Sequence, residues 1–375
     1  MGPRRTCLLL GVLVAAGGLL APTRAPGSGQ SLTFEPAQEV QPLDSDPEAV
    51  AIGDVTGDRR KDVVMTTGAY DNPKYDWKVL LYRQQANGTL AAPEAFLPVW
   101  KVAVHGVALG DVDGDRRNDV VVATDLGVNV FRQRGGTLSQ PFVIPYTVGG
   151  YAVDLADMNR DGREDIIVRG GTWVRIARNL RGGFRGSIVA RGRNQDVEAG
   201  DVNGDRRPDL VAASYKGRLR IYRQRRNGTF SRARIQRTRR GASAVAVADL
   251  TRDGRLDVAT ANRSSLEVLA QTANGRLRSV SVTPGIDYPD GIETLDLSGD
   301  GKVDLIARAS ESVGVVLQQG RGTFGGFDIY HAGRPISWHP DAIAAGDFTG
   351  DGRPDIAAAG GLARGLFVFR QLPQG

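Results

Sequence analysis

Short apolar stretches of three kinds alternate along this chain, and none of them keeps a helical period. The first kind is built of small residues, as in 49–53 (AVAIG), 107–110 (VALG), 244–248 (AVAVA) and 342–346 (AIAAG). The second is β-branched, as in 61–67 (KDVVMTT), 118–124 (NDVVVAT), 164–170 (EDIIVRG) and 208–214 (PDLVAAS). The third alternates apolar and polar residues, as in 78–84 (KVLLYRQ), 127–133 (GVNVFRQ), 218–224 (RLRIYRQ) and 365–371 (GLFVFRQ). Alternation bounded by Gly, Asn and Asp is typical of strands, so the pattern predicts an all-β protein.

Each third stretch runs into a turn such as NGTL, GGTL, NGTF or RGTF, and a fourth, weaker stretch follows. An Asn-Gly pair between two such runs favours a hairpin, because both central residues must take positive φ. The four-stretch unit recurs seven times, at spacings of 44 to 57 residues. A period of this length with four short strands is typical of propeller blades. We therefore predict a single seven-bladed β-propeller of four-stranded antiparallel blades over residues 30–375.

The last unit lacks a fourth stretch, because its third stretch ends only a few residues before the C-terminus at Gly375. Residues 29–40 (GQSLTFEPAQEV) resemble the turn and fourth stretch of the other units. We expect residues 31–40 to complete the last blade and to close the ring. Closure would remove exposed sheet edges, which otherwise invite aggregation.

A nine-residue acidic loop separates the first and second stretches of every unit, beginning with GDVTGDRRKD at Asp54. Positions 1, 3, 5 and 9 carry oxygen side chains, and position 7 would offer its backbone carbonyl. Crowded oxygen ligands suit Ca²⁺, which takes ~6 to 8 oxygens, better than Mg²⁺, which keeps its waters. A solvated Asp-rich turn is the alternative, and seven copies in register disfavour it. The predicted calcium ligands are Asp54, Thr56, Asp58, Asp62, Asp111, Asp113, Asp115, Asp119, Asp157, Asn159, Asp161, Asp165, Asp201, Asn203, Asp205, Asp209, Asp249, Thr251, Asp253, Asp257, Asp296, Ser298, Asp300, Asp304, Asp347, Thr349, Asp351 and Asp355.

The seven loops are not equivalent, and they are not EF-hands. Position 6 is Gly in four loops but Arg59, Arg116 and Arg206 in the others. If that position needs positive φ, each such Arg costs on the order of 1 kcal/mol. Position 12 is Met65 or Val122 in the first two loops rather than the bidentate Glu of an EF-hand. We expect up to seven calcium ions with a structural role, each fixing the first hairpin of its blade.

The motif GDVDGDRRND and its sister copies, followed by a β run and an NGTF-type turn, resemble the FG-GAP/VCBS repeat family. The resemblance covers nearly the whole chain after residue 29. It implies a seven-bladed propeller like the integrin α-subunit head, with calcium between the first and second strands of each blade. Members of this family include adhesion heads, lectins and accessory domains of lyases and hydrolases. Their usual ligand face is the one opposite the calcium loops.

Residues 1–29 are predicted to be an export signal. Arg4 and Arg5 precede an apolar run from Cys7 to Leu20, and cleavage after Gly27 suits the small residues around it. A retained membrane anchor is the alternative, but the run is short against the ~20 residues that span a bilayer. Both a general export signal and a twin-arginine signal remain open. We expect a periplasmic, extracellular or cell-surface protein whose mature chain lacks cysteine and a transmembrane segment, and which is a monomer.

The charge balance bears on partners. The whole chain has 48 basic and 42 acidic residues, and 22 of the acidic ones occupy the predicted loop positions. If divalent ions fill the loops, the remaining surface is basic and would attract anionic partners. The excess of Arg over Lys is equally typical of a GC-rich genome, so both interpretations stay open. Neither favours nucleic acid, and we expect a carbohydrate or protein ligand.

Aromatic and acidic residues in the turns of the opposite face are the candidate ligand contacts, because such rings stack on sugars or hold peptides. Packing between blades is the alternative for each of them. Only the turn at 68–77 is longer than the fold needs. The candidates are Asp71, Tyr75, Trp77, His105, Tyr151, Trp173, Tyr215, Trp338 and His339.

Signals for catalysis are weak. The chain has three histidines and no nucleophile elbow, zinc-binding helix or phosphate loop. The sequence therefore favours a non-catalytic binding or adhesion module. A lyase-like enzyme acting on polysaccharide and a structural component of a cell-surface assembly are the alternatives.

Overall fold

The computed structural model describes residues 23–24, 31–40, 46–68, 77–100, 102–144, 147–214, 216–239, 241–361 and 365–374. Every regular element in these ranges is a β-strand, which confirms the all-β prediction. Nowhere in the described part of the chain is there a helix with the length and apolarity to cross a membrane. The predicted export signal lies outside these ranges, apart from β1 (Thr23–Arg24).

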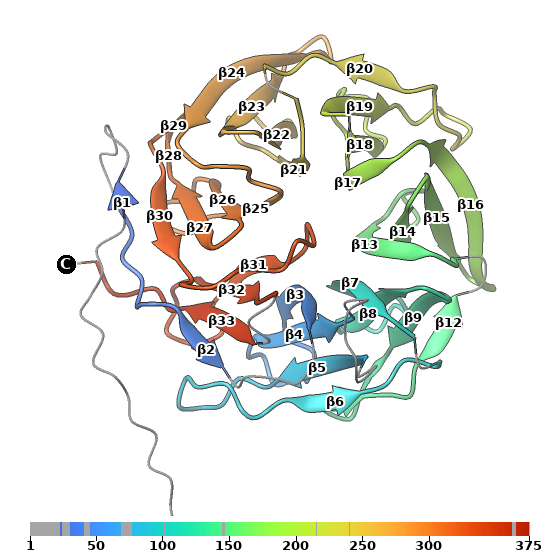
Figure 1. Ribbon diagram of the computed structural model, residues 1–375. Coiled ribbons are helices and arrows are strands. Elements are labelled where there is room, and N and C mark those ends of the chain that lie inside the picture. The colour runs from blue at the N-terminus through green and yellow to red at the C-terminus, as the bar shows by residue number, and fades with distance from the viewer. Residues whose placement is uncertain are drawn as a thin grey trace, which may run out of the picture.

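Seven antiparallel sheets form a ring of blades around a common axis, as predicted (Figure 1). Blade 1 contains β3 (Pro47–Gly53), β4 (Asp62–Thr67), β5 (Lys78–Tyr82) and β6 (Glu94–Phe96). Blade 2 contains β7 (Val104–Gly110), β8 (Asp119–Thr124), β9 (Gly127–Phe131) and β12 (Phe142–Ile144). Blade 3 contains β13 (Gly150–Ala156), β14 (Asp165–Gly170), β15 (Trp173–Leu180) and β16 (Gly183–Arg191). Blade 4 contains β17 (Asn194–Gly200), β18 (Asp209–Ser214), β19 (Arg218–Tyr222) and β20 (Arg234–Gln236).

The remaining blades follow the same order from the axis outward. Blade 5 contains β21 (Ala244–Ala248), β22 (Asp257–Asn262), β23 (Ser265–Gln271) and β24 (Leu277–Pro284). Blade 6 contains β25 (Gly291–Leu295), β26 (Asp304–Ala309), β27 (Ser312–Val316) and β30 (Asp328–His331), with β1 paired outside β30. Blade 7 contains β31 (Ile343–Gly346), β32 (Asp355–Ala359), β33 (Leu366–Phe369) and β2 (Gln38–Val40). Two small hairpins extend the turns of blades 2 and 6: β10 (Gln133–Arg134) with β11 (Thr137–Leu138), and β28 (Gln318–Gly320) with β29 (Thr323–Phe324).

The N-terminal segment supplies the outer strand of blade 7, where the sequence predicted it. Strand β2 pairs with β33 from Gln38, opposite Val368, to Val40, opposite Leu366. An isolated bridge between Phe34 and Gln371 extends this pairing. The first strand of blade 1, β3, packs beside β31 of blade 7. Residues far apart in the sequence therefore share one sheet.

The composition of each strand follows its place in the blade. The second strands of blades 1 to 6 are buried along their whole length, and they are rich in Val, Ile, Leu and Ala. Six of the seven first strands end in Gly or Ala, because the next blade is close. A Cβ on Gly53 would lie 2.9 Å from Leu109 Cδ1, and one on Gly200 would lie 2.7 Å from Val247 Cγ1.

Candidate metal loops and binding groove

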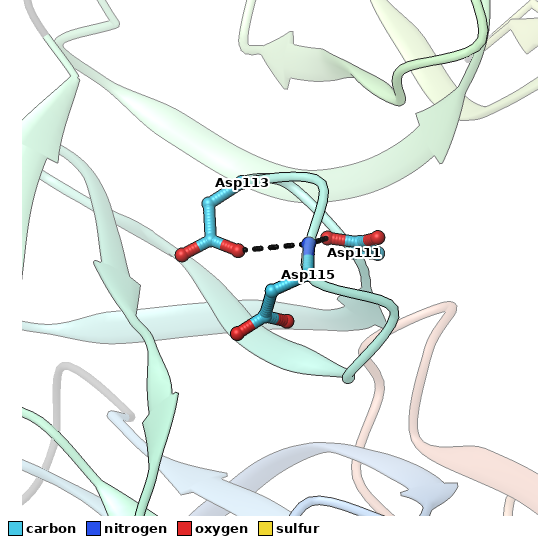
Figure 2. Close-up of side chains that lie close together, drawn as sticks. All are labelled: Asp111, Asp113 and Asp115. Carbon is cyan, nitrogen blue, oxygen red and sulfur yellow. Dashed lines mark hydrogen bonds between the residues drawn. The ribbon is translucent and has the colours of Figure 1, made fainter.

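The acidic loops join the first and second strands of every blade, and the loop of blade 2 shows their construction. Asp111 Oδ1 accepts hydrogen bonds from the backbone N–H of Gly114 (2.6 Å) and Asp115 (3.1 Å), and Asp113 Oδ1 accepts a second one from Asp115 N–H (3.3 Å) (Figure 2). Oxygen atoms of Asp111, Asp113 and Asp115 lie within 4.8 Å of one another. Among the described residues this is the one trio of potential ligands so closely spaced, and it could hold a metal ion.

Two positions of each loop have left-handed backbone. Positions 4 and 6 take positive φ in all seven copies: Gly57, Arg59, Gly114, Arg116, Arg160, Gly162, Gly204, Arg206, Arg252, Gly254, Gly299, Gly301, Gly350 and Gly352. The expected strain at position 6 is therefore present, with φ of 67° at Arg59 and 65° at Arg116. Each of the first five loops carries one Arg in this conformation, whereas the last two use Gly at both positions.

The aspartate at position 9 ties each loop to the third strand of its blade. In every blade its Oδ1 accepts the backbone N–H of a Gln or Asn at the end of that strand or two residues beyond it, at 2.7 to 3.0 Å. All seven side chains are fully buried: Asp62, Asp119, Asp165, Asp209, Asp257, Asp304 and Asp355. Burial raises the pKa of each, to about 6 at Asp119 and Asp304. A divalent ion would favour their ionised form and offset that cost.

Unpartnered oxygens inside the loops fit a metal ion. The hydroxyls of Thr251 and Ser298, at position 3, are buried and make no hydrogen bond of standard geometry with any described residue. The same holds for Oδ2 of Asp257 and of Asp355, at position 9. Such buried oxygens need a partner, and hard oxygen ligands of this kind suit calcium. In six loops the position 5 carboxylate pairs with the cation at position 7, as in Arg163–Asp161 at 2.8 Å. In blade 2, Asp115 pairs instead with Arg134 at 2.8 Å, and the same guanidinium contacts Asp113.

A side-chain amide connects each of several loops to the next blade. The same Gln, or Asn in blade 3, at the end of the third strand reaches the loop of the preceding blade. Gln224 Nε2 donates to Met158 O (2.8 Å), and Gln271 Nε2 donates to Asp201 O (2.8 Å). Gln371 Nε2 and Asn179 Nδ2 make the equivalent bonds to Leu297 O (3.1 Å) and Val112 O (2.7 Å). A shift in the backbone of one loop would therefore be transmitted to the neighbouring blade through this hydrogen bond.

The opposite face carries a groove of about 960 Å³ across blades 4 to 7. Every residue that lines it belongs to a turn between second and third strands, to a crossing between blades, or to a strand end beside them. Two aromatic rings stand at its rim: the side chains of Tyr288 and Trp338 are 64% and 82% exposed. Tyr288 has a φ of 49°, and the Arg263 guanidinium lies 5.5 Å from the centre of its ring. Exposed rings held in a strained turn are typical of binding sites.

Polar groups lie buried beneath these rings. Arg308, in β26, is 1% exposed, pairs with Asp290, and its Nε makes no hydrogen bond to any described residue. Burial lowers the pKa of Arg308 and raises that of Asp290. Asn262, also 1% exposed, accepts a hydrogen bond from Ser265 Oγ, and its Nδ2 has no partner in the described chain. The groove therefore has exposed rings at its rim, whereas the unpaired N–H groups of Arg308 and Asn262 are closed off from solvent.

Comparison with known families agrees with the loops. The model of the FG-GAP-like repeat matches residues 54–122, 111–168, 201–260, 249–307 and 296–358, and every match starts at a first loop aspartate. The chain belongs to the FG-GAP repeat family. Among curated protein sequences, none matches it.

Solved structures share the fold of this FG-GAP protein at low sequence identity. BBS1N, in complex with ARL6DN, is 15% identical with a TM-score of 0.60, over 92% of this chain and 98% of that one. An Agrocybe aegerita lectin that recognises non-reducing terminal N-acetylglucosamine is 23% identical with a TM-score of 0.56, over 83% and 88%. A functionally unknown protein from Desulfotomaculum acetoxidans is 15% identical with a TM-score of 0.52, over 77% and 90%. At these identities the likeness concerns the fold alone.

The predicted ligand residues of this FG-GAP propeller fall into separate places. His105, Tyr151 and His339 come together: the rings of His105 and Tyr151 are 5.1 Å apart, and His339 Nε2 lies 2.7 Å from Tyr151 O. Trp77 packs against the core shared by blades 1 and 2, and Trp173 against the core shared by blades 2 and 3, so both contribute to blade packing. Of the set, Trp338 alone lines the groove. Asp71, Tyr75 and Tyr215 lie outside the described residues.

Most residues of the groove were not predicted from the sequence. Tyr288 and Arg263 lie in ordinary short connections, which give no signal of their own. Arg308 did leave one, because it interrupts the otherwise apolar run DLIARA of β26. A lone Arg in a fully buried strand needs a partner or a ligand.

Proposed function

We propose that this FG-GAP propeller is an exported, calcium-stabilised binding module that recognises a saccharide without catalysis, through the groove across blades 4 to 7. The observation that carries the proposal is the presence of two exposed rings, Tyr288 and Trp338, on a groove that Lys216 and Arg263 also line. Aromatic faces stack on sugar rings, and charged donors hydrogen-bond to sugar oxygens. A volume of about 960 Å³ is ample for a short saccharide.

Charge at the rim supports an anionic saccharide. Lys216 and Arg263 line the groove, and Asp287 is the acid there that has no basic partner in a described ion pair. The similar fold of the lectin, at 23% identity, supports a saccharide ligand for this scaffold. Partner proteins usually need more than ~1,000 Å² of interface, so a small concave groove favours a small ligand.

Calcium would be held by positions 1, 3, 5 and 9 of the loops, on the face away from the groove. Its role there would be to neutralise crowded carboxylates and to fix each loop against its third strand. Blade 2, with Asp111, Asp113 and Asp115, is the strongest candidate. The groove would then depend on calcium only through the rigidity of the blades.

A glycan array with purified protein tests the function. We expect binding to uronate-containing or sulfated saccharides, and a loss of roughly 10- to 100-fold in affinity for Trp338→Ala, the usual cost of removing a stacking anchor. Trp100→Ala is the matched control, because Trp100 is also exposed (45%) but lies outside the groove. Silence across acidic and neutral glycans, or equal binding by both variants, would overturn the saccharide assignment.

Lyase action is a second candidate, favoured by one observation. His105 Nε2 lies 3.1 Å from Asp125 Oδ1, and its ring lies beside Tyr151, which reaches solvent. Burial lowers the pKa of the adjacent His339 to about 3, so that side chain stays neutral. Incubation with uronate polymers should show ultraviolet absorbance of an unsaturated product if this cluster is catalytic.

A further inference from the structure

The axis of the ring encloses a polar cavity that the binding function does not use. Its volume is about 260 Å³, and the first strands of several blades line it. The residue three places before each first loop aspartate lies at one strand position in all seven blades. It is Ala51, Ala108, Asp154, Glu198, Ala246, Glu293 and Ala344 in chain order. Small residues suit a crowded axis, so three acids at this position need an explanation.

These acids meet more acids and one arginine. Asp196 and Asp341 also line the cavity, and Arg169 is the single basic residue among the described residues around it. Burial, reinforced by the neighbouring carboxylates, raises the pKa of Glu293 to about 8 and that of Asp154 to about 7. Glu198 and Asp341 shift in the same direction. Such a cavity attracts positive charge.

Arg169 supplies an independent observation. It is 6% exposed, lines the cavity, and its Nε makes no hydrogen bond to any described residue. Its Nη1 has only a long contact, 3.5 Å, with Asn194 O. A buried guanidinium N–H without an acceptor is costly. Arg169 lines the cavity but takes part in no described ion pair, so an occupant that carries an acceptor as well as positive charge would complement the cavity wall.

The spacing of the axial carboxylates and the size of the cavity limit which molecules can occupy it. Outside the blade 2 loop, no three His, Cys, Asp or Glu ligand atoms of the described residues lie within 4.8 Å of one another. The axial carboxylates are thus too far apart for one bare metal ion to contact three of them. The volume of about 260 Å³ is below the ~300 Å³ at which drug-sized sites begin, and would hold about nine waters. A compact organic cation fits this space, and an oligosaccharide does not.

We propose that the axial cavity binds a free basic amino acid of the lysine, ornithine and arginine class. Its ammonium or guanidinium groups face Asp154, Glu198 and Glu293, and its carboxylate faces Arg169. Charge-assisted hydrogen bonds would then join the ligand to carboxylates and a guanidinium that form no described ion pair with one another. This site is separate from the groove and from the metal loops, so it stands or falls independently of the saccharide function.

Isothermal titration of the calcium-loaded full chain tests the proposal, first with wild-type protein alone. L-lysine should bind with one site per chain. Norleucine, which lacks the side-chain ammonium, and cadaverine, which lacks the carboxylate, should each bind roughly 10- to 100-fold more weakly, the range for one lost charge-assisted hydrogen bond. Equal binding of cadaverine would contradict the role of Arg169. Heat from Mg²⁺ alone, or no heat from lysine, ornithine or arginine, would leave a hydrated ion or water as the occupant and overturn the proposal.

Variants then place the site. Glu198→Gln and Arg169→Gln should each weaken lysine binding by a similar factor, and in Arg169→Gln the preference for lysine over cadaverine should disappear. Glu311→Gln is the matched control, because Glu311 is an exposed acid of blade 6. Melting curves confirm that each variant is folded before titration. Lysine binding that survives both axial substitutions would assign the heat to another place.

Discussion

At the scale of single residues, the loops show which of their positions are chosen by backbone geometry. Positions 4 and 6 both require left-handed φ, yet the first five loops fill one of them with Arg. Only Gly takes this conformation freely, and other residues lose about 1 kcal/mol or more. The carboxylates of positions 1, 5 and 9 are thus kept in all seven loops, while the backbone is strained in five.

Replacing a loop glycine with alanine measures the free-energy cost of positive φ separately from other effects. Gly301 has a φ of 77°, and a Cβ built on it would meet nothing within 4 Å. Gly301→Ala should therefore lower the free energy of unfolding by about 1 kcal/mol through the backbone alone. Urea unfolding in calcium measures the change. Gly182→Ala is the control, since Gly182 is equally open without positive φ, and a matching loss there would contradict the explanation.

At the scale of the blade, the acidic loop acts as a clamp between strands. The last aspartate of the loop accepts a hydrogen bond from a Gln or Asn near the end of the third strand. The side chain of that Gln or Asn donates to the loop of the preceding blade, as Gln224 does to Met158 O (2.8 Å). Seven buried carboxylates with raised pKa values make this clamp unfavourable without a cation. Metal binding would therefore be felt as stability of whole blades rather than of loops.

Calcium removal tests that role. Metal-stripped protein should melt roughly 10 °C or more below calcium-loaded protein, because each filled site adds about 2.7 kcal/mol at a hundredfold excess over its dissociation constant. Differential scanning calorimetry measures the difference, and Mg²⁺ at equal concentration should restore less of it. Asp113→Asn should show a smaller calcium increment than wild type, whereas the exposed Asp287→Asn should not. An unchanged melt after stripping would remove the structural role.

The blade itself was predictable from sequence because its signals are local. Small, β-branched and alternating stretches each correspond to an observed strand, and the acidic loops lie where they were expected. Even the long-range pairing of β2 with β33 followed from a similarity between 29–40 and the fourth stretches. Local patterns could not tell which aromatic residues face solvent: Trp77 packs in a core, whereas Trp338 is 82% exposed.

At the scale of the whole molecule, the two cavities are made by residues that meet only when the ring forms. The groove draws on blades 4 to 7, and the axial cavity on blades 1 to 4, 6 and 7. Neither has a contiguous motif. An alignment of the seven units does show the axial acids, since Asp154, Glu198 and Glu293 replace Ala at one repeat position. The sequence therefore does contain a signal for the axial acids, but it appears only when the seven repeats are compared with one another.

The axial acids also predict how stability depends on pH. Burial, with Asp341, Asp196 and Asp154 nearby, raises the pKa of Glu293 from 4.5 to about 8. Between these values the unfolded chain is ionised at this residue while the folded chain keeps its proton, so the folded state binds more protons. Stability from this group is complete below about pH 4.5 and is lost as pH rises toward about 8.

In the Glu293→Gln variant the side chain at this position is a neutral amide, which cannot ionise. Relative to wild type, the variant should gain little at about pH 5 and most at about pH 9, when both proteins are unfolded by urea at constant calcium. The loop carboxylates titrate in both proteins, so their contribution cancels in the difference. Glu311→Gln, at an exposed position, should follow the wild type at every pH. A Glu293→Gln advantage that stays constant across the range would show that Glu293 is ionised in the folded ring, and that the axial carboxylates are already neutralised by charge from elsewhere.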